Sequence, residues 1–410
     1  MTDNVVDALR VAEPTIHRFP QNLRRIGTER DYIVPRSVAL GPYYHGVAEL
    51  GAMEEVKLAA VGYFFEGLAG ESREEAYKKI FPIACSVRSC YADASALKGI
   101  TDDEFATMMF VDGCFLVQFM ITVVGSRGDK LRSLIQPHLL WILRDVMLLE
   151  NQIPWPVVQF LIALKGLPIS EIVDFLASCL HGTLASGGSI GVDIDEESRK
   201  PSHLLCLVLS NIVGHSRRRG RSHILPGMAT VKASTSAAEL AEIGIKLRAC
   251  EMTAKFSAMG IVEGPFFAQL SLVPLLLQID TASWLVNMAA FEMYTESMWT
   301  DDCSINSYLA VVSLLITRKE DVRELRTKGI VQGFSDQGTL DFFDGLSTYL
   351  CACHAYEQTI VDLEDYKRKR WLWIAVYRFL YSNARTIATV LSVVGVLVGI
   401  FKAIFSLKQH

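Results

Sequence analysis

The order of apolar and polar positions along the chain predicts a mainly helical protein. Apolar residues recur at helical spacing in several stretches that Gly, Pro and short polar runs separate. Thr101 with Glu104 three residues later forms a capping box, so a helix begins there, and Gly125 ends it. The predicted helices cover residues 53–68, 71–97, 101–124, 131–149, 154–166, 168–180 and 202–213, and helices return from residue 281 onward.

The pattern changes after Ser236. Residues 243–249, 253–261 and 266–279 read as extended, and glycines such as Gly260 separate them. We therefore expect one small antiparallel sheet. The predicted fold class is mainly α with one small antiparallel β-sheet (α+β), plus a C-terminal transmembrane helix.

The C-terminal stretch from Thr386 to Leu407 predicts a membrane anchor. It carries no charge before Lys402, and its apolar residues cover every face of a helix. With Lys402 snorkelling, the stretch is long enough to cross a hydrocarbon core of about 30 Å. Three residues follow it, which indicates a tail anchor. The alternative is a buried terminal helix of the globular domain.

The charges beside this stretch predict its orientation. Basic residues lie mostly on its N-terminal side, so the positive-inside rule keeps residues 1–385 in the cytosol. We expect the plasma membrane rather than an internal membrane. The cluster Lys367–Arg370 is a candidate contact for anionic headgroups, or else a solvated helix face. Gly395 and Gly399 form a GxxxG pair through which two copies could pack as a homodimer.

Changes in composition along the chain divide it into three parts. Residues 1–30 are polar and predicted to be poorly ordered, residues 31–382 form one large helical domain, and residues 383–410 form the anchor. Within the domain we distinguish residues 31–181, the Gly/Ser-rich acidic loop 182–201, a helix with the small sheet in 202–280, and a helical part 281–382. A second loop, residues 215–223, is strongly basic through Arg217, Arg218, Arg219 and Arg221.

Composition narrows the class of protein. Of the 410 residues, 50% are hydrophobic and 21% are charged, so a disordered chain is excluded. A formal net charge of −5 and a pI near 6.0 disfavour nucleic acid as a partner. Nine cysteines without a secretory signal fit a reducing compartment with free thiols.

No motif predicts catalysis, a cofactor or a metal. The chain has no P-loop, Rossmann glycine fingerprint, HExxH or nucleophile elbow. Cys351, Cys353 and His354 lack a second ligand pair at zinc-finger spacing, so we interpret them as core or helix-face residues. Asp112 lies inside an apolar helix and needs a buried partner, for which Arg88 is the candidate. Glu150 and Asn151 are expected to bond backbone groups at the turn before Pro154.

Several short runs, taken together in their order and spacing, resemble the plant family called domain of unknown function 247, of the UPF 0481 type. The most specific run is Asp145 to Pro154, and Gly41-Pro42-Tyr43 and Asp112-Gly113-Cys114-Phe115 support it. The family usually has a histidine where Tyr44 stands. The residues of this resemblance that we expect to be structural are Pro35, Gly41, Pro42, His45, Glu54, Lys57, Arg88, Tyr91, Asp112, Gly113, Glu150, Asn151, Gln152, Pro154, Glu239, Asn287 and Glu292.

The resemblance implies a plant protein with a C-terminal membrane anchor and no established enzyme activity. Some grass members are linked to pollen–stigma self-incompatibility, where they are thought to act as recognition determinants. Our leading hypothesis is a membrane-anchored interaction or signalling module with an unidentified protein partner. That partner would bind the acidic and basic loops. The alternatives are an enzyme with an unrecognised site around His45, Asp112 and Glu150, and an ectodomain that faces out of the cell.

Overall fold

The computed structural model describes most of the chain between residues 15 and 407. The described ranges are 15–21, 24, 32–66, 68, 70, 72–125, 130–168, 171–172, 174–175, 201–213, 236–250, 255–264, 267–294, 304–350 and 354–407. The loops 182–200 and 215–223, with Arg217, Arg218, Arg219 and Arg221, lie outside these ranges. Most of the helix predicted over residues 168–180 lies outside them as well.

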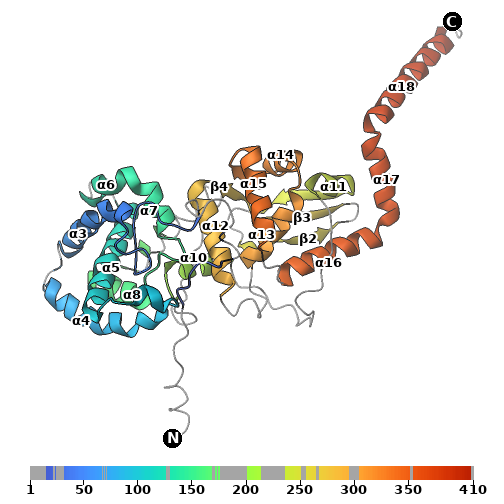
Figure 1. Ribbon diagram of the computed structural model, residues 1–410. Coiled ribbons are helices and arrows are strands. Elements are labelled where there is room, and N and C mark those ends of the chain that lie inside the picture. Colours follow the sequence, from blue (N-terminus) through green and yellow to red (C-terminus); the bar gives the residue numbers. More distant parts are fainter. Residues whose placement is uncertain are drawn as a thin grey trace, which may run out of the picture.

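Helix α5 (Asp102–Val124) is the centre of the N-terminal lobe (Figure 1). The predicted capping box between Thr101 and Glu104 is confirmed, and the helix ends before Gly125 as expected. Four helices pack against α5: α3 (Gly51–Phe65), α4 (Arg73–Ser86), α6 (Lys130–Ile135) and α8 (Trp155–Lys165). Because neighbouring helices cover α5 on several sides, most of its residues are buried. This explains why its apolar residues are not confined to one stripe along the helix.

Gly113 allows α8 to cross close to α5. A Cβ atom at this position would lie 2.5 Å from Cδ1 of Leu161 and 3.3 Å from Cγ1 of Val157, both on α8. A larger side chain would therefore push the two helices apart. This close packing accounts for the glycine inside an otherwise bulky helix.

Two predicted helices are interrupted. The stretch 131–149 consists of α6, a 3-10 turn over Gln136–His138, and α7 (Leu139–Asp145). Pro137 lacks an amide hydrogen and prevents one continuous helix. The stretch 71–97 is helical only as α4, and two 3-10 turns, Arg88–Cys90 and Ala94–Leu97, follow it.

The C-terminal lobe contains two small sheets rather than one. The first holds β1 (Ile245–Ala249), β3 (Ala268–Leu272) and β2 (Gly260–Glu263) in that order. Strand β2 pairs antiparallel with β3, but β1 pairs parallel with it. The second sheet is the parallel pair β4 (Leu275–Leu277) and β5 (Val331–Gly333).

The expectation of one antiparallel sheet is therefore wrong in two respects. Strand β3 lies between β1 and β2 in the sheet and runs parallel to β1 and antiparallel to β2; strand periodicity does not record this order. The predicted strand 266–279 also breaks at Val273 and Pro274, so its two halves join different sheets. Proline cannot donate to a strand ladder, which explains the break.

Helix α12 (Ile279–Glu292) connects the two lobes. It packs against α7 of the first lobe, against α10 (Leu204–Val213), and against α13 (Ser304–Leu315) of the second. Helices α11 (Ala237–Glu242), α14 (Lys319–Thr327) and α15 (Asp336–Ser347) complete the second lobe. The buried apolar side chains of both lobes form one hydrophobic cluster.

Residues 15–21, at the N-terminal edge of the described chain, pack onto the first lobe. Ile16 and Phe19 are buried, and Ile16 forms a parallel bridge with Tyr91. The amide of Ala92 donates to the Ile16 carbonyl at 3.0 Å. These contacts fix the short segment 15–21; the other residues of 1–30, except Arg24, lie outside the described ranges.

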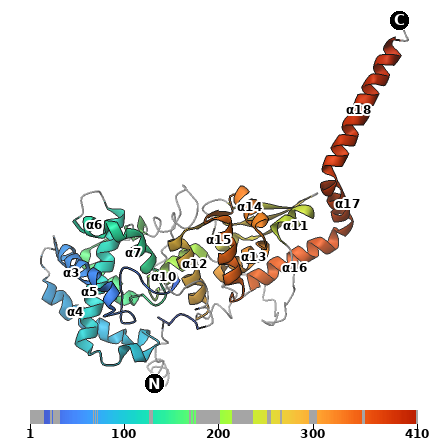
Figure 2. The same ribbon diagram turned by 45° about the horizontal axis from the view of Figure 1, so that its top comes forward.

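The C-terminal part of the chain forms an arm that leaves the second lobe (Figures 1 and 2). It consists of α16 (His354–Lys369), α17 (Trp371–Ser382) and α18 (Ala384–Leu407). Helix α16 packs on α13 and β2, and α17 contacts α11. Helix α18 projects away from both lobes in both views.

A span long and apolar enough to cross a membrane occurs once in the described residues, and it is α5 rather than α18. Most of α5 is buried in the first lobe, as expected for the core helix of a globular body. Within α18, Thr386–Ile400 counts as a shorter apolar helix. The sequence thus predicted a helix correctly at this position, and the apolar part of that helix in the described residues is shorter than a membrane span.

Candidate functional site

Most residues of the predicted structural set gather around one irregular segment, residues 32–45. This segment contains Pro35 and Pro42, both buried, and it runs between α3, α5 and the turn that follows α7. Helices supply their own backbone hydrogen bonds, but this segment has no strand partner in the described chain, and so side chains must satisfy it. We call residues 32–45 the clasped segment.

Asp112 fastens the clasped segment to α5. Its Oδ1 accepts a hydrogen bond from Lys57 Nζ at 2.6 Å, and its Oδ2 accepts one from the Gly41 amide at 2.8 Å. Lys57 also donates to the Ala39 carbonyl at 2.8 Å and pairs with Glu54 at 2.7 Å. Burial raises the pKa of Asp112, and the Lys57 ammonium opposes that rise.

Arg88 is not the partner of Asp112, contrary to the expectation from the sequence. Its guanidinium donates to the carbonyls of Leu97 and Ile100 and pairs with Asp102, and it lies over the ring of Phe105. Arg88 therefore stabilises the chain entering α5. Lys57 on α3 takes the expected role because α3 packs along α5 at the level of Asp112.

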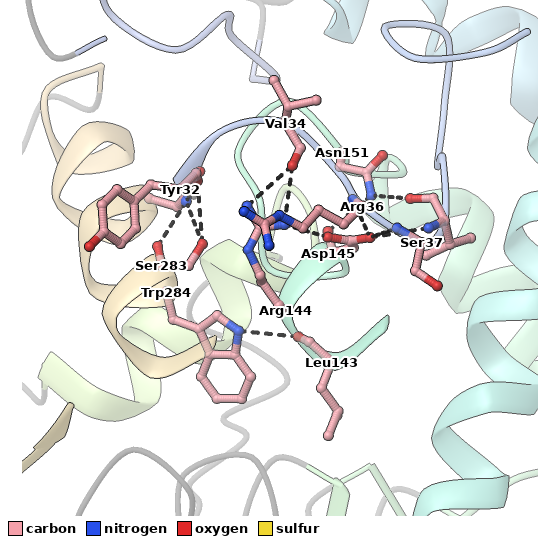
Figure 3. Close-up of polar contacts among 12 residues, drawn as sticks. Tyr32, Val34, Arg36, Ser37, Leu143, Arg144, Asp145, Asn151, Ser283 and Trp284 are labelled. Atoms are coloured by element: carbon pink, nitrogen blue, oxygen red, sulfur yellow. Dashed lines mark hydrogen bonds and ion pairs between the residues drawn. The ribbon is translucent and has the colours of Figure 1, made fainter. Parts of the chain in front are cut away.

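Asp145 binds three successive amides of the clasped segment (Figure 3). Its Oδ2 accepts from the amides of Arg36, Ser37 and Val38 at 2.9, 2.6 and 3.1 Å. Its Oδ1 accepts from Arg144, which also donates to the Val34 carbonyl at 3.1 Å. Burial raises the pKa of Asp145 to about 6, against the opposing charge of Arg144.

Asn151 supplies the complementary donors and acceptor. Its Oδ1 accepts from the Leu40 amide at 2.7 Å, while its Nδ2 donates to the carbonyls of Val38 and Asp145 at 3.0 and 2.9 Å. An aspartate would lack the donors, so the amide side chain is required here. The structure agrees with the expectation that Asn151 bonds backbone groups.

The side chains of Gln152 and Asn287 also form hydrogen bonds with backbone groups of neighbouring turns. The Gln152 side-chain amide donates to the Val146 and Leu148 carbonyls and accepts from the Leu205 amide. The Asn287 side chain on α12 accepts a hydrogen bond from the Leu149 amide and donates one to the Tyr32 carbonyl. The second bond connects α12 to the clasped segment; Tyr32 is labelled in Figure 3. Pro154 is the N-cap residue of α8.

Gly41 occupies the tightest point of the clasped segment. Its φ angle is +72°, which an L side chain adopts with strain. A Cβ atom there would lie 2.6 Å from the Tyr91 hydroxyl and 3.0 Å from the Gln152 carbonyl. That hydroxyl donates to the same Gln152 carbonyl at 3.0 Å. Glycine is therefore required both for the backbone conformation and for space.

Glu150 binds the N-terminal residues to the first lobe. Its carboxylate accepts from the Phe19 amide at 2.6 Å and from the Tyr44 hydroxyl at 2.7 Å, and it pairs with Arg18 and Arg24. Burial, and then the Glu150 charge, raise the pKa of Tyr44 well above its ordinary value. Tyr44 thus joins the end of the clasped segment to Glu150 through its hydroxyl.

His45, Asp112 and Glu150 do not converge on a shared pocket. His45 is exposed, whereas Asp112 and Glu150 are buried and bound to different partners. Among the residues that the structure describes, no three His, Cys, Asp or Glu side chains gather as metal ligands. Burial raises the thiol pKa of Cys114 and of Cys90, so these thiols are little ionised at neutral pH. Cys351 and Cys353 lie outside the described residues.

Two further carboxylates bind backbone in the second lobe. Glu239 forms a capping box with Ser236 at the start of α11. Glu292, at the end of α12, accepts from the amides of Ile305 and Asn306 at 3.1 and 2.9 Å, and so holds the start of α13. Burial raises the pKa of Glu292 to about 7.

The titration of Glu292 predicts a pH-dependent stability. Its pKa is about 7 in the folded chain, against an ordinary value of 4.5, so the folded state holds the proton more tightly. Its favourable contribution is complete below the unfolded pKa and is lost as the pH rises through about 7. We expect the Tm of the wild type, relative to Glu292→Gln, to fall between about pH 5 and about pH 8. If calorimetry showed the same Tm difference between the two proteins at every pH in this range, the prediction would be contradicted.

Sequence reasoning missed several of the residues that hold this arrangement together. Arg144 and Asp145 are adjacent in a run that is otherwise apolar. Such an adjacent pair could have indicated a buried ion pair, which the structure shows. Asp321 accepts from the amides of Thr317 and Arg318 and also from Ala238 on α11. No local pattern indicated that link between α14 and α11.

Comparison with known proteins places the chain in a family. A family model described as a plant protein of unknown function, DUF247, matches residues 16–398. The chain belongs to this DUF247 family. Among curated proteins, it is 24% identical to the UPF0481 protein At3g47200 of Arabidopsis thaliana over 72% of the chain and 64% of that protein.

A second Arabidopsis relative, the putative UPF0481 protein At3g02645, is 25% identical over 41% of this DUF247 chain and 31% of its own length. The chain thus spans less than two thirds of either relative. No solved structure matches it. The resemblance from Asp145 to Pro154 is confirmed at the level of the family, and the structure shows that this run builds the turn that holds the clasped segment.

Proposed function

We propose that this DUF247 protein is a non-enzymatic interaction module that α18 anchors in a membrane, with both lobes on the cytosolic side. The observation that carries the proposal is the exposure of α18. Eight of its apolar side chains are between 49% and 65% exposed: Val390, Leu391, Val393, Val394, Val396, Leu397, Val398 and Ile400. Small residues, Ala388, Ser392, Gly395 and Gly399, occupy the remaining side of the helix. No charged stripe therefore interrupts this surface, as lipid contact requires.

The apolar part Thr386–Ile400 is short for a span by itself, but the backbone of α18 continues to Leu407, and the whole helix is long enough for a bilayer. Its 24 residues, at about 1.5 Å per residue, span about 36 Å, compared with a hydrocarbon core of about 30 Å. Within Thr386–Leu407 the one charged residue is Lys402, and its long side chain can reach the headgroups. Six basic residues between 367 and 385 precede the span, and the positive-inside rule then keeps the lobes in the cytosol.

The use of the polar residues supports a non-enzymatic role. Asp112, Asp145 and Glu150 bind backbone amides of neighbouring segments and paired cations. An acid or base in catalysis must instead face a substrate. An active site around His45, Asp112 and Glu150 has less support, because the three side chains do not meet.

Recognition of a protein partner is the activity we propose for the lobes. The loops around residues 182–201 and Arg217–Arg221 remain the candidate surface, because loops on a rigid scaffold tolerate variation. Recognition between pollen and stigma is the version of this role that the family resemblance suggests. Gly395 and Gly399 are both exposed on α18, so they are the candidate contact for pairing within the bilayer.

Protease protection tests the proposed topology. The full chain, with different epitope tags at each end, is placed in sealed vesicles whose cytosolic face points outward. We expect added protease to remove the N-terminal tag and to spare the C-terminal tag until detergent opens the vesicles. Loss of both tags without detergent would contradict a spanning helix. Protection of the N-terminal tag would instead support lobes that face away from the cytosol.

A further inference from the structure

Helix α17 presents an apolar face to the outside of the molecule. Trp371, Leu372, Val376 and Phe379 are 64%, 62%, 53% and 64% exposed. At 100° per residue, these four positions fall on one side of the helix. Such a face on a helix next to α18 is unusual for a surface that meets only water.

The opposite side of α17 is fixed to the second lobe, so the outward face cannot turn inward. Tyr377 packs edge to face against Phe267, with ring centroids 5.4 Å apart, and approaches Gly244. Just before α17, Arg370 donates to the Gly264 carbonyl at 2.8 Å. The body therefore holds the outward face in one orientation relative to the start of α18.

The charged residues within and beside α17 are mostly basic. From Tyr366 to Arg385 the chain has no Asp or Glu, but it has Lys367, Arg368, Lys369, Arg370, Arg378 and Arg385. Asp365 pairs with Arg368 at 2.7 Å, and Glu242 approaches Arg378 at 3.8 Å. Glu263 also lies 4.0 Å from Arg370. Over residues 366–385 the excess of basic over acidic residues in the sequence still complements an anionic surface.

We propose that the outward face of α17 inserts among the headgroups of an anionic leaflet, beside the point where α18 enters the bilayer. This inference rests on the proposed anchor. Trp, Leu and Phe on one side of a helix with neighbouring Lys and Arg is the composition of interfacial helices. The insertion would set how the two lobes lie against the membrane, because α17 is rigidly attached to the second lobe. α17 and α18 take different directions in both views (Figures 1 and 2).

Tryptophan quenching by brominated lipids tests this contact, because α18 contains no tryptophan and α17 contains Trp371 and Trp373. The full chain is reconstituted in phosphatidylcholine vesicles with or without phosphatidylserine, and the phosphatidylcholine carries bromine near the headgroup. Flotation with the vesicles is measured first. We expect quenching of up to about a third of the emission in anionic vesicles, since two of the six tryptophans lie on α17.

Two variants separate the contact from the anchor. Leu372→Glu with Phe379→Glu alters only exposed positions, so we expect it to fold and to float while losing the quenching. Trp371→Phe with Trp373→Phe should float and lose the same part of the emission. Wild type that floats without quenching, or quenching unchanged by the two glutamates, overturns the inference and leaves the anchor intact. Wild type that does not float overturns both.

Discussion

Lys57→Met is expected to destabilise the chain by about 3–5 kcal/mol. The side chain is 1% exposed, and Asp112 beside it is 3% exposed. Removing the ammonium leaves a buried carboxylate whose remaining donor is the Gly41 amide, together with an unpaired Ala39 carbonyl. Urea unfolding followed by circular dichroism measures the loss. A change below about 1 kcal/mol would show that the pair is not buried in solution.

Two control variants separate the lost charge pair from the lost side chain. Lys130→Met removes an exposed lysine that pairs with Glu66, and we expect a change within about 0.5 kcal/mol. Lys57→Met with Asp112→Leu removes both charges, so it should recover much of the stability, since a well-packed apolar pair can replace a buried ion pair. A double variant less stable than the single one would contradict the account of Asp112.

Asp145→Ala is expected to cost a similar amount, about 3–5 kcal/mol. The change removes the acceptor for the amides of Arg36, Ser37 and Val38, and it leaves the buried Arg144 without its carboxylate. The loss should fall first on the clasped segment. Amide hydrogen exchange measures this directly, because protection of those three amides should decrease more than protection within α5.

Asp145→Asn is the matched control for this prediction. It keeps one acceptor oxygen of the same shape, so we expect an intermediate loss and partial protection of the three amides. If the alanine variant exchanged these amides at the wild-type rate, then Asp145 would not hold the segment, and its burial would need another explanation.

The sequence predicted local features of the fold well and long-range partners poorly. The capping box at Thr101 and Glu104 and the run of helix α5 follow from residues close together in the chain. The need of Asp112 for a partner also followed from its apolar surroundings. The identity of that partner did not, since Lys57 lies 55 residues away and its spacing from Asp112 carries no signal.

The same limit explains the other differences. The parallel pairing of β1 depends on β3 lying between β1 and β2 in the sheet, and the periodicity of the sequence does not give this order. Asp145 binds amides more than 100 residues earlier in the chain, so only the folded structure reveals its task. For the anchor, the sequence predicted the helix, and the structure adds that the apolar faces of Thr386–Ile400 stay uncovered by the lobes.

The most direct measurement of the central claim, that α18 anchors the protein, is membrane partition of a truncated chain. The full chain, a chain that ends at Arg385, and a control that lacks only residues 408–410 are expressed in plant cells, and their membranes are washed with alkaline carbonate. We predict that the full chain and the control stay with the membranes, while the chain ending at Arg385 moves to the soluble fraction. Carbonate-resistant membrane association of the chain ending at Arg385 would contradict the claim.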